Sequence, residues 1–323
     1  MRTGVRLLLW MLFLGLLVSV AEGRWIRYAS AEALAQVPLR TGATAPDAAI
    51  GGAGGRHFLW KVEAGTASAY LLGSLHFGSP ELYPLPEPVT AAYAESSALV
   101  VEANIQGLRD AAAMAPLLAA GLYQDGSTLQ DHLPPDLWQR LGVAADELGI
   151  PAALLAVQRP WLASFTLTAL ALQRAGFSED LGLDLHFMNV ANGHKPILEL
   201  ESVEGQFALL QNLPDGDQVD MLRQALDELE QGPAYFRSML QAWERGDTAA
   251  MQQLMTEGLE QGATQERLYQ RLVTQRNASM ADRLATLLEQ GGTYFVVVGA
   301  GHLVGPESVV DLLEARGYRV RRF

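Results

Sequence analysis

The same short turn occurs twice in the chain, each time directly after a β-prone run. Gly73-Ser74-Leu75-His76 follows the apolar run 69–72, and Gly299-Ala300-Gly301-His302 follows the β-branched and aromatic run 293–298. Such runs bounded by glycine are typical of buried strands. Each turn leads into a loop and then a predicted helix and a second predicted strand. Because one unit is repeated, we predict an α/β (α+β) fold of two related β-loop-α-β halves that form a central mixed sheet.

The remaining segments fit around these two halves. Residues 57–63 alternate like a strand and form a hairpin with 69–73, and 98–102 is a short apolar strand that ends at Glu102. Because parallel strands are joined by right-handed crossovers, we expect the strand before His76 and the strand ending at Glu102 to be parallel neighbours. A large helical insertion is predicted at 111–172 and a second one at 219–288. Between them, a further strand is predicted at 195–200.

The N-terminus is typical of an export signal. Arg2 and Arg6 precede the apolar run 7–20, and small residues stand at Ser19 and Ala21. The run is shorter than the roughly 20 residues that a membrane-spanning helix needs, which favours cleavage over an uncleaved anchor. We therefore predict a signal peptide at 1–21, a flexible lead-in at 22–55 and a single domain at 56–323.

Charge and cysteine content exclude several classes of function. The chain carries 36 acidic and 23 basic residues, a formal net charge of -13, and no cysteine. Because nucleic acids and anionic membranes are bound largely through Lys and Arg, we expect no nucleic-acid partner and no membrane contact after signal cleavage. Without cysteine there are no disulfides and no thiolate ligands, so any metal site must use His, Asp or Glu.

Three side chains are predicted to meet at one edge of the sheet. His76, Glu102 and His302 each follow a predicted strand, and functional groups gather beyond the carboxyl ends of such strands. Two imidazoles and a carboxylate can hold a divalent ion such as Mn, Co or Zn and leave positions open for water. Glu102 is either a ligand or a general base; alternatively, it only marks the solvent end of its strand.

Two further residues are candidates for catalysis. Asp184 could support the site, or could instead cap a helix. Arg276 could hold a substrate carboxylate or a developing oxyanion through its planar fork, or form a salt bridge on a helix. We assign Glu201 and Gln206 to the core of the fold.

Several of these motifs resemble the TraB/GumN family. The resemblance covers about 57–323 and is carried by the two Gly-x-x-His turns, Val101-Glu102, and three further segments at 182–187, 200–206 and 276–277. This family is similar to the metal-dependent TIKI proteases, and more distantly to erythromycin esterases and haem-binding ChaN proteins. The resemblance implies two related α/β halves with helical insertions, and it strengthens the assignment of Glu102 to the site.

These observations together predict an exported metal-dependent hydrolase, periplasmic or secreted, that acts on a peptide or a small molecule, with peptide bonds favoured. The chain has no His-Glu-x-x-His helix, no Gly-x-Ser-x-Gly elbow and no phosphate-binding loop, which disfavours ordinary zincins, serine hydrolases and nucleotide-driven enzymes. Two alternatives stay open: a haem or metal binding protein without turnover, and an accessory protein of envelope or exopolysaccharide assembly.

Overall fold

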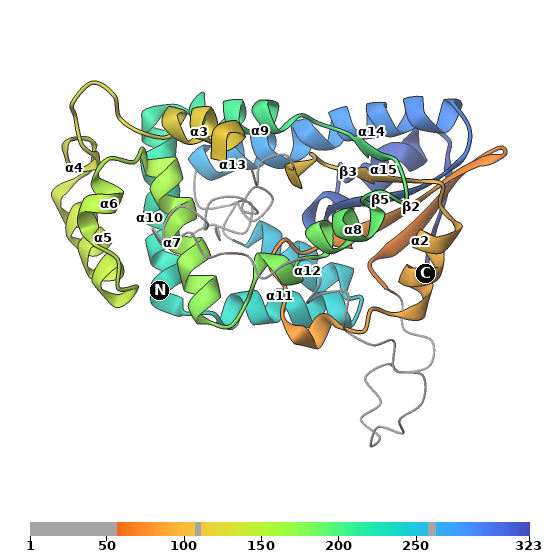
Figure 1. Ribbon diagram of the computed structural model, residues 1–323, viewed down its shortest axis with the longest axis horizontal. Coiled ribbons are helices and arrows are strands. Elements are labelled where there is room, and N and C mark those ends of the chain that lie inside the picture. Colours follow the sequence, from red (N-terminus) through yellow and green to blue (C-terminus); the bar gives the residue numbers. More distant parts are fainter. Residues whose placement is uncertain (1–56, 107–110, 258–262) are drawn as a thin grey trace, which may run out of the picture.

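A computed structural model describes residues 57–106, 111–257 and 263–323 (Figure 1). The predicted signal peptide at 1–21 and lead-in at 22–55 lie outside the described residues. Among the residues described, no helix is long and apolar enough to cross a membrane.

A six-stranded mixed sheet, with the strand order β4-β3-β5-β2-β1-β6, forms the centre of the described part of the chain. The predicted hairpin is confirmed, because β1 and β2 pair antiparallel, and β6 pairs antiparallel with the other edge of β1. The four strands from β4 to β2 are parallel to one another. The strands are β1 (Leu59–Ala64), β2 (Ala67–Ser74), β3 (Ala98–Val101), β4 (Ile197–Glu199), β5 (Thr293–Gly299) and β6 (Arg319–Arg322).

The two β-loop-α-β halves interleave, which corrects one prediction. We expected β2 and β3 to be neighbours, but β5 lies between them and pairs in parallel with both. The first half passes from β2 through α2 (Glu87–Glu95) to β3, and the second from β5 through α15 (Val309–Ala315) to β6. The crossover rule fixes handedness and parallel direction but not adjacency. The run Phe295–Val298 is fully buried, as suits a strand covered on both faces.

Helices cover both faces of this sheet. On one face, the rings of Tyr93 in α2 and Phe187 in α8 (Leu183–Ala191) pack against Phe295 of β5. Figure 1 shows α14 (Gln275–Glu289) and α15 along the opposite side. A π-helical turn (Gln270–Thr274) runs directly into α14. The surrounding helices are α9 (Val203–Gln211), α11 (Ala234–Glu244), α12 (Thr248–Thr256) and α13 (Ala263–Tyr269).

The helices of the predicted insertion after β3 share a small separate core with α10, which belongs to the second predicted insertion. Leu137, Leu141, Leu167 and Leu222 are buried in a cluster separate from the core around the sheet. In Figure 1 these helices lie to the left of the sheet. They are α3 (Ala111–Ala120), α4 (Leu129–His132), α5 (Pro135–Glu147), α6 (Ala152–Ala156), α7 (Pro160–Arg174) and α10 (Asp215–Gln231).

Candidate active site

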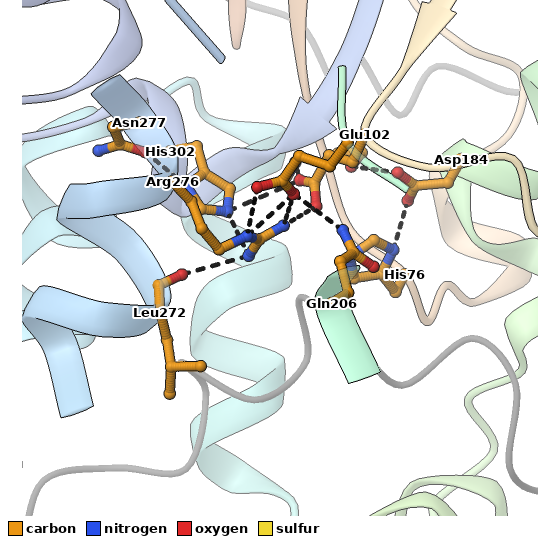
Figure 2. A network of polar contacts seen from close by, with 11 residues as sticks. His76, Glu102, Asp184, Gln206, Leu272, Arg276, Asn277 and His302 are labelled. Atoms are coloured by element: carbon orange, nitrogen blue, oxygen red, sulfur yellow. Dashed lines mark hydrogen bonds and ion pairs between the residues drawn. The ribbon is translucent and has the colours of Figure 1, made fainter. Parts of the chain in front are cut away.

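Four adjacent parallel strands each deliver one ionisable side chain to the same edge of the sheet. Glu201 follows β4, Glu102 follows β3, His302 follows β5 and His76 follows β2. Because these strands run in the same direction, their carboxyl ends lie side by side. Figure 2 shows His76, Glu102 and His302 in one region of polar contacts. Arg276 of α14 contacts Glu102, Glu201 and His302, and Asn277 of α14 contacts His302.

His76 is held by a buried carboxylate. Its Nδ1 lies 2.9 Å from Asp184 Oδ2, and Ser74 Oγ donates to Asp184 Oδ1 at 2.8 Å. Burial alone would lower the pKa of His76, but the Asp184 carboxylate outweighs burial and raises that pKa to about 9. His76 Nε2 is buried and has no hydrogen-bond partner among the described residues. The ion pair with Asp184 thus orients the ring through Nδ1.

Two glycines let the His76 loop approach Asp184. Gly78 exchanges backbone hydrogen bonds with Ser178, and Leu183 at the start of α8 donates to Leu75 O. A Cβ on Gly182 would lie 2.1 Å from His76 O, and one on Gly78 would meet Leu181 O at 2.0 Å. Only glycine permits this backbone contact. The contact places Asp184, in the first turn of α8, beside His76.

His302 is fully buried and held in a defined tautomer. Asn277 Nδ2 donates to Glu307 O at 2.8 Å, so its Oδ1 faces His302 Nδ1 at 2.5 Å and must accept from it. His302 Nε2 is then the acceptor, and Arg276 Nη1 lies 3.1 Å from it. Burial, then Arg276 and His76, keep the pKa of His302 well below its ordinary value of 6.5. Glu307, whose carbonyl accepts from Asn277, has a φ of +58°, which is uncommon for a residue other than glycine.

Arg276 joins the two glutamates. Its Nη2 donates to Glu102 Oε2 at 2.7 Å and to Glu201 Oε2 at 2.6 Å, and its Nε donates to both oxygens of Glu201. Gly299 N donates to Glu102 Oε1 at 2.6 Å. Burial raises the pKa of Glu102, and the positive charges of Arg276 and His76 oppose that rise. The guanidinium therefore faces carboxylates of the protein itself.

The residues singled out from the sequence come together, but not as a closed metal site. His76, Glu102, Asp184, Arg276 and His302 all belong to the network in Figure 2. His302 Nε2 lies 3.7 Å from Glu102 Oε1, and Arg276 contacts both side chains. In the described part of the chain, no three His, Asp or Glu side chains are close enough together to hold a metal ion. The roles assigned to these residues stay predictions.

The sequence analysis placed Glu201 in the core, whereas the structure places it in the site. Glu201 holds Arg276 and accepts from Gln206 Nε2 at 3.0 Å. A signal was available: Glu201 follows the short strand β4 just as Glu102 follows β3. Ser74 and Glu307 act on the histidines through Asp184 and Asn277, and no sequence pattern marks such indirect contacts.

The chain matches a known protein family over most of its length. The profile of the TraB/PrgY/gumN family matches residues 58–322. The chain belongs to this family. It is similar to the uncharacterized protein YbaP of Escherichia coli, with 28% identity over 264 residues that cover 80% of this chain and 94% of YbaP. An uncharacterized protein of Treponema pallidum is 26% identical over 272 residues, which cover 80% of this chain and 80% of that protein.

A third relative carries a functional name. The protein named metalloprotease TIKI1 of Danio rerio is 26% identical over 311 residues, which cover 81% of this chain and 62% of that longer protein. No solved structure matches the chain. The family therefore includes proteins named metalloproteases, and these share most of this chain's length.

Proposed function

We propose that this family member is an exported metal-dependent hydrolase, and that peptide bonds are its favoured substrate class. The observation that carries the proposal is the matched presentation of the two histidines. Each has its Nδ1 beside a side-chain oxygen, that of Asp184 for His76 and that of Asn277 for His302. Nε2 of His302 faces Arg276 and Glu102, and Nε2 of His76 is buried. This is the usual support of a metal-ligating histidine, because a polar contact at Nδ1 fixes the orientation of the ring.

The donor set has the chemistry that a divalent ion requires. His76, His302 and Glu102 would hold the ion, with Mn, Co and Zn as candidates. The buried Nε2 of His76, which has no hydrogen-bond partner in the described residues, supports this assignment. When bound, the ion would lower the pKa of a coordinated water and make it nucleophilic near neutral pH.

The other side chains would act on these ligands and on the substrate. Asp184 orients His76, and Asn277 orients His302. Glu102, whose pKa is raised by burial, is placed either to ligate the ion or to accept the proton from the attacking water. Arg276 is a candidate for holding a developing oxyanion, a role for which its guanidinium would have to exchange a protein carboxylate for the substrate.

Peptide bonds are favoured because relatives with 26% identity are named metalloproteases. The test begins with metal-stripped protein and a peptide library, assayed before and after addition of Mn, Co or Zn. We expect cleavage only with added metal. We also expect His76→Ala and His302→Ala to lower bound metal by well over tenfold, because about three protein ligands hold such an ion. The exposed His194, replaced by Ala, is the matched control.

Other outcomes of this experiment point to other functions. Metal bound without cleavage of any peptide would favour a binding protein without turnover, and a Soret band on mixing with haemin would favour haem as its ligand. Metal content unchanged in both histidine variants would remove the shared site altogether. Export is tested separately: the mature N-terminus should lie at or near Glu22, and recovery of intact Met1 from a membrane fraction would contradict it.

A further inference from the structure

Arg276 already supplies a positive charge to the centre. The side chain is 3% exposed, and all three guanidinium nitrogens have partners. Nε and Nη2 contact Glu201, Nη2 also contacts Glu102, and Nη1 contacts His302 Nε2 and the carbonyl of Leu272. Because Glu102 is buried and Glu201 is largely covered, this cation offsets much of the cost of removing their carboxylates from water.

His302 Nε2 cannot serve Arg276 and a metal ion at once. His302 Nε2 has a single lone pair, and in the structure it faces Arg276 Nη1 at 3.1 Å. Glu102 Oε2 faces Nη2 at 2.7 Å. A divalent ion on these two side chains would also lie a few ångströms from a guanidinium, and like charges at that distance in a buried site repel strongly. Occupation of His302 by metal therefore requires Nη1 to leave it.

Glu201 can still hold the Arg276 guanidinium after its contacts with Glu102 and His302 are broken. It contacts Arg276 through Nε at 3.0 and 3.1 Å and through Nη2 at 2.6 Å, and these contacts use neither of the shared side chains. Gln206 fixes the Glu201 carboxylate from the other side. Arg276 is also the second residue after the π-helical turn at 270–274, and such turns occur often at functional sites.

We propose that Arg276 is an internal cation of this centre, and that it releases Glu102 and His302 when a divalent ion is bound while Glu201 retains it. The proposal rests on the proposed metal-dependent function. It assigns Glu201 a positioning role that acts through Arg276.

The first test measures zinc affinity by calorimetry on the full-length mature protein. Arg276→Met removes the charge and keeps the length of the side chain, so zinc should bind at least about tenfold more tightly than in the wild type. Arg140→Met is the matched control, because Arg140 also contacts two carboxylates, Asp227 and Glu230, but in the helical insertion. Equal or weaker zinc binding by Arg276→Met would overturn the proposal.

A double-mutant cycle tests the role of Glu201. With Arg276 present, Glu201→Gln should weaken zinc binding at least about tenfold, because the arginine then depends more on Glu102. In the Arg276→Met background the same change should have an effect of less than about threefold. An equal effect in both backgrounds would show that Glu201 acts directly on the ion, and would overturn this part of the proposal.

A measurement on the wild type avoids dependence on how the variants fold. Buried arginines give separate 15N NMR signals for their Nε–H and Nη–H groups, and Arg276→Lys identifies those of Arg276. On titration with zinc the Nη–H signals should shift, while the Nε–H signal, held by Glu201 in both states, should change little. Unchanged Nη–H signals at saturating zinc would overturn the exchange.

The proposed function and the exchange fail in different ways. If the wild type and all variants bind no Zn, Mn or Co, both are overturned. If the wild type binds zinc through His76 and His302 but Arg276→Met binds no more tightly, only the exchange is overturned.

Discussion

The His76–Asp184 ion pair makes the stability of the metal-free protein depend on pH. Asp184 raises the pKa of His76 from its ordinary 6.5 to about 9 in the folded state. Between these values the folded protein holds a proton that the unfolded chain has lost, so stability must fall as the pH rises. The contribution is fully present below pH 6.5 and is lost by about pH 9.

The size of this effect follows from the same two values. Each pH unit between them corresponds to about 1.36 kcal/mol, which gives a loss of at most about 3.4 kcal/mol in the free energy of unfolding. This limit applies with little screening, because the side chains of His76 and Asp184 are 13% and 10% exposed. Such a loss is a large fraction of the 5–15 kcal/mol typical of native proteins.

Urea unfolding of metal-stripped protein from pH 6 to 9.5 measures the effect. In Asp184→Asn the carboxylate is gone and burial lowers the pKa of His76, so the loss of stability between pH 6.5 and 9 should disappear. Asp227→Asn, which removes a carboxylate paired with Arg140, is the control and should keep the wild-type slope. Equal slopes in the wild type and Asp184→Asn would refute the assignment of this ion pair.

Three further changes test how the site is built. Gly182→Ala should cost about 1–3 kcal/mol in urea unfolding, because the new Cβ would lie 2.1 Å from His76 O; Gly142→Ala, in α5 with open space around it, should be neutral or stabilising. Asn277→Ala should lower zinc affinity about 10–100-fold in calorimetry, and unchanged affinity would exclude its orienting role. Glu102→Gln should keep most of the metal yet lose at least about a hundredfold in peptidase activity if Glu102 is the base, whereas recovery in excess metal would make it a ligand.

The sequence predicted those features of the fold that local pattern determines. The hairpin of β1 and β2, the β-prone run of β5 and the two turns that end at His76 and His302 are all visible as short-range signals. The order of strands is a long-range property. β5 lies some 190 residues beyond β3 in the chain, and nothing local to either strand shows that it pairs between β3 and β2.

The partners of the site residues could be predicted only in part. Glu102 and the histidines follow strands, so topology brings them to one edge. Asn277 and Arg276 come from a long helix, where any polar residue is usually solvated and where periodicity alone does not show that two adjacent polar side chains are buried. Their burial becomes evident only when α14 is placed against the ends of the strands.

The two histidine turns are alike in sequence but opposite in charge state. His76 faces a carboxylate, which favours its protonated form near neutral pH, whereas His302 faces an amide and a guanidinium and stays neutral. A metal ligand must be the neutral imidazole, so His302 is prepared to donate while His76 must first give up a proton. The Nε2 lone pair of His302 is nevertheless already occupied, because Arg276 Nη1 faces it. Each histidine is therefore restrained by a different group, a proton in one case and an arginine in the other, and both restraints must be released together if the two turns are to bind one ion.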